Sequence, residues 1–214
     1  MLATRSALVS LLVAIALAIP ACRRDIPVPS SPPATADSPT NAPATKRVVG
    51  PLSDADAQAL ATMNDRIKDY IALHQKLERT LPAVPKEATP EQIDQNQRAL
   101  EKLMQKNRAT AKPGDIFTPI AQPVIKRLLA SVFGGPDGKQ LKSSIMDENP
   151  VGIKLAVNAR YPDIVPLSTV PPEVLQTLPK LPEELQYRFV GNRLIILDAH
   201  AHVVADFIED ALPN

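Results

Sequence analysis

The residues with the clearest capacity for chemistry lie near the C-terminus, in the segment IILDAHAHVVADF, 195–207. Asp198, His200 and His202 alternate there with alanine and bring one carboxylate and two imidazoles close together. Imidazole nitrogen and carboxylate oxygen are ligands of Zn²⁺ and related transition metals. If the segment is extended, alternate side chains share one face, and both imidazoles can bind one ion with Asp198 or Asp206 nearby. A turn between the histidines destroys that alignment.

The same Asp-x-His-x-His pattern resembles the signature that opens the metal-dependent amidohydrolases. In that superfamily the signature ends the first strand of a (β/α)₈ barrel, and later strands supply further ligands and the catalytic acid. Such a barrel takes about 250 residues. Only residues 203–214 follow His202 here, and the sole other histidine is His74. We therefore predict that DAHAH is a hairpin turn, in which the Asp198 side chain bonds backbone two residues further on.

The remaining polar residues do not form a catalytic constellation. The only cysteine is Cys22, and the chain contains no P-loop, G-x-S-x-G or dinucleotide-binding pattern. Neighbouring residues on a helix or strand point in different directions, so adjacent carboxylates do not make an acid–base pair. This applies to Asp147–Glu148, Glu183–Glu184 and Glu209–Asp210. We predict that the protein is not an enzyme, and we assign no catalytic residue, cofactor or metal ligand.

Charge also limits the partners. From Cys22 onward, the count of 24 basic residues less Arg5 leaves 23, which equals the 23 acidic residues. Because no basic stripe with aromatic residues is present, we expect no nucleic-acid partner. Arg160, close to Asn158, Tyr161 and Asp163, could meet an acidic ligand, but a surface ion pair is the simpler interpretation.

The elements that must position these residues begin near Leu52. Apolar residues at alternating spacings of three and four predict a helix over 54–80, with Ser53 as its N-cap and His74 within the apolar stripe. We expect His74 to be packed rather than to act as a ligand. An intramolecular helical hairpin fits better than a dimeric coiled coil, because a partner helix follows at once.

Further helices are predicted over 90–110, 119–133 and 137–147. The second carries a Thr89–Gln92 capping box with Pro90 at its first position. The Pro-rich stretch 162–182 also holds many apolar residues, so we expect an ordered connector with a short helix in PPEVLQTL.

Periodicity then changes to that of strands. Residues 153–161 alternate between apolar and polar side chains, two further strands flank Gly191-Asn192, and a last strand follows in HVVADFI. The predicted fold class is therefore α+β: an N-terminal helical hairpin plus two shorter helices, then a small C-terminal antiparallel sheet of three to four strands. We assign residues 52–214 to this single domain.

The N-terminus has the pattern of an export signal. The apolar run 7–19, interrupted only by Ser10, is shorter than the ~20 residues of a spanning helix. The following IPAC resembles the lipobox of bacterial lipoproteins, although Pro20 departs from the usual residue. That resemblance implies a signal peptide over 1–21 and an acylated Cys22 as the new N-terminus; the alternative is an ordinary secretory signal. Arg23, rather than Asp, implies sorting to the outer membrane.

Between the signal and the domain, residues 25–45 hold six prolines and almost nothing to bury. We expect the whole stretch 22–51 to be a disordered Pro-rich tether, either a spacer that holds the domain off the membrane or a leader without a task.

Three segments, GDIFTPIAQPVIKRLL, IMDENPVGIKLAVNARYP and LPKLPEELQYRFVGNRLIILDAHAHVVADFIEDALP, resemble an uncharacterised family of exported bacterial proteins. The final YRFVGNRLIILDAHAHVVADFI resembles the terminal hairpin of small periplasmic proteins linked to envelope or metal homeostasis. Neither resemblance implies a catalytic residue. We therefore expect a lipid-anchored, non-catalytic module that faces the periplasm and binds or stabilises another envelope component. The alternative is a periplasmic metal-binding or metal-buffering protein that uses His200 and His202.

The lipobox resemblance makes one directly testable prediction, that Cys22 is the mature N-terminus and carries lipid. Mass spectrometry of the membrane fraction should find an acylated N-terminal peptide that begins at Cys22. A Cys22→Ser variant should lack the modification. An unmodified N-terminus elsewhere, or a freely soluble exported protein, would contradict the prediction.

Overall fold

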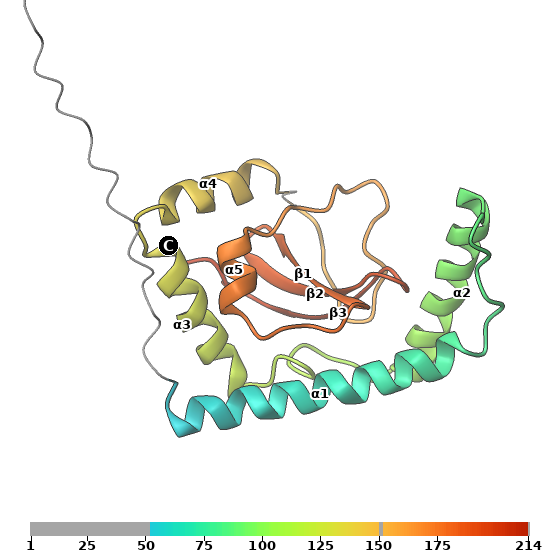
Figure 1. Cartoon of the computed structure of the whole chain (residues 1–214), viewed down its shortest axis with the longest axis horizontal. Helices are drawn as coiled ribbons and strands as arrows, with labels where there is room; N and C mark the ends of the chain where they lie inside the picture. The colour runs from blue at the N-terminus through green and yellow to red at the C-terminus, as the bar shows by residue number, and fades with distance from the viewer. Residues whose placement is uncertain (1–51, 150–151, 214) are drawn as a thin grey trace, which may run out of the picture. The chain divides into compact units, whose positions relative to one another are not determined.

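A computed structural model describes residues 52–149 and 152–213. The predicted signal peptide (1–21), the predicted tether (22–51) and Cys22 all lie outside these residues. The described chain is α+β, as predicted, with its helices first and an antiparallel sheet at its C-terminal end (Figure 1). The elements are α1 (Asp54–Glu78), α2 (Pro90–Asn107), α3 (Ala121–Phe133), α4 (Gly138–Asp147), α5 (Pro172–Thr177), β1 (Leu185–Val190), β2 (Arg193–Asp198) and β3 (Val203–Ile208). Within the described residues, no helix is both long and apolar enough to cross a membrane.

Local capping chemistry sets the start of the first two helices. Ser53 accepts a hydrogen bond from the Asp56 N–H at the start of α1. At α2, the Thr89 hydroxyl accepts from the Gln92 N–H, and the Gln92 side chain accepts from the Thr89 N–H. Both caps match the prediction, because each depends only on residues within one turn.

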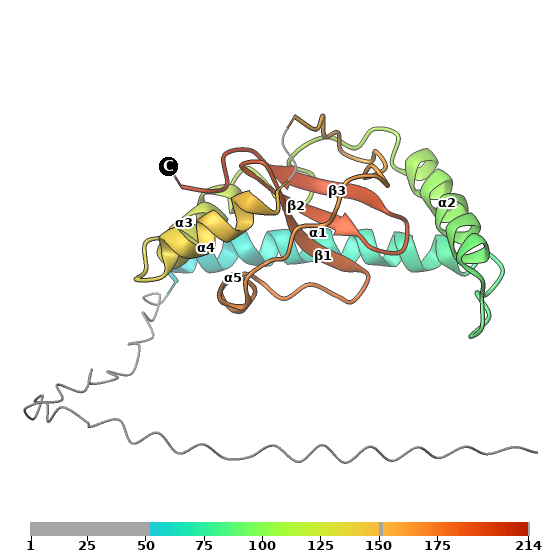
Figure 2. The same ribbon diagram turned by 90° about the horizontal axis from the view of Figure 1, so that it is seen from above.

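Helix α1 supplies the surface against which much of the domain packs. Its buried residues recur at the predicted spacings of three and four, and they are Ala59, Met63, Ile67, Tyr70, His74 and Leu77. The helix runs beneath the sheet, as the view from above shows (Figure 2). Helix α2 follows after a connecting loop. It runs toward the C-terminal end of α1 at a steep angle and does not lie along α1 (Figure 1).

The sheet has the order β1-β2-β3, with β2 in the centre. Val190 pairs with Arg193 across a two-residue turn, and Gly191 has a φ of 59°, which glycine adopts without strain. Residues 199–202 join β2 to β3, so DAHAH lies in a hairpin turn as predicted.

The two faces of the sheet are both covered. The face toward the helices contributes to the main core, whereas the opposite face carries a smaller cluster that includes Tyr161, Ile195 and Phe207. Every residue of β3 is buried as a result. Such a strand shows a continuous apolar run, apart from its single aspartate, rather than an alternating pattern.

The predicted strand over 153–161 is wrong, because no ladder forms there. Its apolar residues do pack, half-buried, on the smaller cluster. The alternation of apolar and polar residues therefore predicted correctly which side chains face the core. The backbone reaches β3 only locally, through the N–H of Asn158 to the Val204 carbonyl (2.7 Å) and an isolated bridge between Arg160 and Val203. A left-handed φ of 66° at Asn158 interrupts the extended run. The described sheet therefore has three strands.

A buried carboxylate holds the connection between α2 and α3 against the sheet. Asp206 accepts hydrogen bonds from the backbone N–H groups of Gly114 (3.0 Å), Ile116 (2.7 Å), Phe117 (2.8 Å) and Phe207 (2.8 Å). Burial raises the pKa of Asp206, while these four donors act in the opposite direction and favour its charged form.

Asp206→Asn should destabilise the fold by about 2–3 kcal/mol, because the amide NH₂ would face N–H donors at a buried site. Urea denaturation should show a lower midpoint with little change in slope. Glu209→Gln is the matched control, since its surface pair with Arg193 is exposed and should contribute less than about 1 kcal/mol. Equal losses in the two variants would contradict this role for Asp206.

Candidate metal centre

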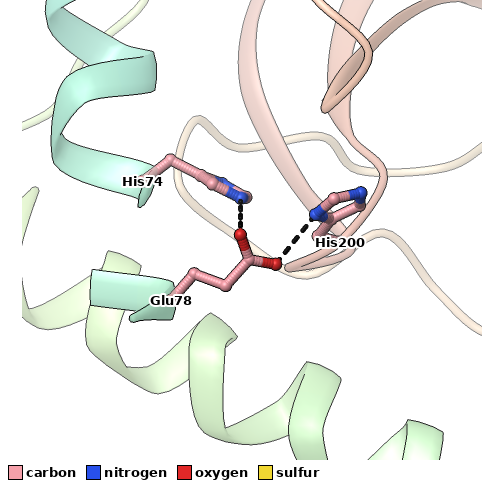
Figure 3. A group of neighbouring side chains, drawn as sticks. All are labelled: His74, Glu78 and His200. Carbon is pink, nitrogen blue, oxygen red and sulfur yellow. Dashed lines mark hydrogen bonds and ion pairs between the residues drawn. The ribbon is translucent and has the colours of Figure 1, made fainter. Parts of the chain in front are cut away.

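The last turns of α1 face the turn between β2 and β3. Tyr70, His74 and Glu78 follow one another at intervals of four residues, which places them on one face of the helix. His200 approaches from the β2–β3 turn. Figure 3 shows the carboxylate of Glu78 between the imidazoles of His74 and His200. The centre thus joins side chains that are 122 residues apart in the chain.

The three side chains are close enough to share an ion. Glu78 Oε1 lies 2.9 Å from His200 Nδ1, and Glu78 Oε2 lies 3.6 Å from His74 Nε2. The two imidazole centroids are 5.4 Å apart. The side chain of His74 is fully buried, while those of Glu78 and His200 are 39% and 43% exposed. The group therefore has a buried inner wall and an outer side that solvent can reach.

His74 is oriented by a second carboxylate. Its Nδ1 lies 2.7 Å from Asp198 Oδ2, and that side chain is also fully buried. With the proton on Nδ1, the Nε2 atom is left as an acceptor. Nε2 is buried and has no hydrogen-bond partner among the described residues. Histidines that bind metals characteristically donate their other ring N–H to a carboxylate in this way.

Two opposing effects act on the proton affinity of His74. Burial alone would lower its pKa, but the hydrogen bond to Asp198 and the negative charges of Asp198, Glu78 and Glu184 outweigh burial and raise it. A surrounding that stabilises a proton on an imidazole also stabilises a metal cation at the same nitrogen. The two therefore compete for Nε2.

The centre has an excess of negative charge. Glu78, Asp198 and Glu184 form no ion pair with Lys or Arg in the part of the chain that the structure describes. Glu78 also occupies the last turn of α1, where the helix dipole favours cations over carboxylates. A divalent cation would offset both the unpaired negative charge and the unfavourable position of Glu78 at the C-terminal end of the helix.

The possible ligand atoms are spaced more widely than the ligands around a bound ion. Nitrogen and oxygen ligands of tetrahedral Zn²⁺ lie about 2.0–2.2 Å from the metal and hence about 3.4 Å from one another. Here the possible ligand atoms all lie within 4.8 Å of one another. Binding would therefore draw the side chains together by up to about 1.4 Å, which the exposed Glu78 and His200 can accommodate.

The structure separates the two histidines of DAHAH. His202 has a φ of 55°, and its Nε2 lies 3.7 Å from Asp163 Oδ1. Its ring also packs edge-on against the ring of Tyr161, with 5.8 Å between the two ring centroids. The ligand group contains His200 but not His202.

His74 is packed, as predicted, yet it also forms the buried wall of the centre. Glu78 was missed by the sequence analysis. The available signal was its spacing of four residues from His74 on a predicted helix, which places both side chains on one face.

The other polar residues highlighted by the sequence have structural partners. Arg160 donates to Asp163 (2.6 Å), Glu101 (2.9 Å) and Gln97 (2.9 Å), and its side chain is only 15% exposed. An acidic ligand would have to displace these partners, so the ion-pair interpretation fits the geometry.

Comparisons with known proteins add no relative: no family model, no curated protein and no solved structure matches the chain. The centre is thus defined by its own residues. Two imidazoles and one carboxylate, with a second carboxylate orienting the buried imidazole, have the donor chemistry of a transition-metal site.

The buried Asp198 network makes a stability prediction. Tyr70→Phe removes a 2.8 Å hydrogen bond to the buried carboxylate of Asp198 and should cost about 1.5–2 kcal/mol. Tyr187→Phe is the control, because that buried hydroxyl donates to the neutral Pro179 carbonyl and should cost about 1 kcal/mol or less. Chemical denaturation measures both changes. A smaller loss for Tyr70→Phe than for Tyr187→Phe would contradict the prediction.

Proposed function

We propose that this protein is a membrane-tethered, non-catalytic module of the bacterial cell envelope that binds a divalent transition-metal ion of the Zn²⁺ class. One observation carries the proposal. His74 Nε2 is buried without a hydrogen-bond partner among the described residues, 3.6 Å from Glu78 Oε2, while Asp198 holds the opposite ring nitrogen. A histidine with a packing role alone would gain by pairing both nitrogens, because a buried unsatisfied polar atom costs about 1–3 kcal/mol.

The donor atoms favour one class of metal. Imidazole nitrogen suits Zn²⁺, Co²⁺, Ni²⁺ and Cu²⁺, whereas Ca²⁺ and Mg²⁺ prefer an all-oxygen shell. With two imidazoles and a single carboxylate in the group, the centre matches the first class. This proposal keeps His200 from the metal-binding hypothesis and replaces His202 with His74 and Glu78.

The sequence features at the N-terminus support the location. A lipid on Cys22 would fix the module at the membrane, and a Pro-rich tether over 22–51 would let the domain extend away from the membrane surface. Such an arrangement suits metal binding or buffering in contact with another envelope component. The outer-membrane assignment continues to depend on Arg23.

Calorimetric titration of Zn²⁺ into the full chain tests the proposal. The chain carries Cys22→Ser, so that its only thiol cannot compete. One ion should bind with micromolar or tighter affinity. His200→Ala and Glu78→Gln should each weaken binding by at least about 10–100-fold. His202→Ala, a change in the same turn, should leave the affinity within about twofold, since it removes no ligand.

Stability provides a second readout. Zn²⁺ at 100 times its dissociation constant should stabilise the parent chain by about 2.7 kcal/mol. His74→Ala is a poor test, because it also removes a partner of the buried Asp198. A folded parent chain that fails to bind Zn²⁺, Ni²⁺ or Cu²⁺, or equal losses in His200→Ala and His202→Ala, would refute the proposal.

A further inference from the structure

A second glutamate lies next to the proposed centre. Glu184 immediately precedes β1, and its Oε1 accepts a hydrogen bond of 2.8 Å from the side chain of Gln75, the residue after His74. Its backbone carbonyl accepts a bond of 2.8 Å from the N–H of Ala199, the residue before His200. Glu184 is therefore anchored on both sides by neighbours of the two imidazole ligands.

Glu184 is a buried residue whose carboxylate has few hydrogen-bond donors. The residue is 6% exposed. The hydrogen bond from Gln75, followed by one from the backbone of Glu184 itself and by the charges of His74 and His200, lowers the pKa of Glu184 despite its burial. The carboxylates of Asp198 and Asp206, two fully buried residues, each have four hydrogen-bond partners.

Glu184, by contrast, receives one side-chain donor among the described residues. The carboxylate therefore retains capacity for a cation. In the described part of the chain, no Lys or Arg side chain forms an ion pair with it.

We propose that Glu184 is the fourth protein ligand of the ion bound by His74, Glu78 and His200, and that it exchanges Gln75 for the metal when the ion binds. This inference rests on the proposed function. It turns a three-ligand site into one with two neutral imidazoles and two carboxylates, whose charges balance a divalent cation. Four protein ligands give the closed tetrahedral coordination of structural Zn²⁺ sites, without an open position for a substrate.

The exchange requires movement of one side chain. The carboxylate of Glu184 lies outside the group of atoms within 4.8 Å of one another, so it must rotate toward the imidazoles. Its backbone can stay in place, since the bond from Ala199 fixes only the carbonyl. Gln75 thus holds the carboxylate of Glu184 away from the imidazoles and competes with the ion for it.

Co²⁺ provides the spectroscopic test, because tetrahedral Co²⁺ absorbs visible light far more strongly than five- or six-coordinate Co²⁺. The full chain with Cys22→Ser should show the intense bands. Glu184→Gln should shift these bands, because water takes the place of the carboxylate, and should lower the Co²⁺ affinity by about 10–100-fold. Glu183→Gln, which removes the same charge from an exposed neighbour, should change neither.

Gln75→Ala makes the opposite prediction. It removes the competitor for Glu184, so the Co²⁺ affinity should rise, and the intense bands should remain. Thermal unfolding of each metal-free variant checks that it folds. If Glu184→Gln does not fold, the spectrum of the parent chain and the titration of Gln75→Ala still test whether Glu184 is a ligand.

The outcomes separate the two proposals. Weak Co²⁺ bands in the parent chain, a Glu184→Gln variant that behaves like Glu183→Gln, or an unchanged or lower affinity in Gln75→Ala would overturn the role of Glu184 and leave the three-ligand centre intact. Failure of the folded parent chain to bind Co²⁺ or Zn²⁺ at all would overturn the proposed function itself.

Discussion

The buried carboxylate of Asp198 is the interaction on which both the packing of α1 and the candidate centre depend. It lies at the end of the central strand and accepts hydrogen bonds from the Tyr70 hydroxyl (2.8 Å), the His74 imidazole (2.7 Å) and the backbone N–H groups of His200 (3.1 Å) and Ala201 (2.8 Å). An unpaired buried charge is strongly destabilising, so these four donors must stay together. One side chain thereby ties a long N-terminal helix to a C-terminal turn.

The same interaction determines what the centre can do. Because Asp198 takes Nδ1 of His74, the remaining nitrogen of that ring is directed at Glu78 and His200. Because Asp198 also fixes the turn, His200 is presented to the same place. Burial and the Asp198 charge raise the pKa of Tyr70 well above its ordinary value, which keeps its hydroxyl protonated and able to donate. Fold stability and ligand orientation are therefore coupled through one carboxylate.

A β-bulge places two buried aspartates, Asp198 and Asp206, on the same face of the sheet. Asp198 pairs with Val203, and Ile196 pairs with Asp206, so a step of two residues in β2 matches a step of three in β3. The extra residue brings Asp206 to the helix-covered face as well, where it holds the 114–117 loop. Asp206 has only backbone partners, which makes its role structural, whereas Asp198 divides its bonds between the backbone and side chains next to the centre.

The sequence by itself determined the features that depend on near neighbours. The caps at Ser53 and Thr89, the periodicity of α1, the turn at Gly191-Asn192 and the turn in DAHAH were all predictable, since each reflects chemistry within a few residues. Residues 153–161 misled the prediction because alternating burial does not require a hydrogen-bonded ladder. Only the tertiary structure decided which imidazoles meet. His200 faces His74 and Glu78 rather than His202, because the packing of α1 beneath the sheet joins parts of the chain that no local pattern connects.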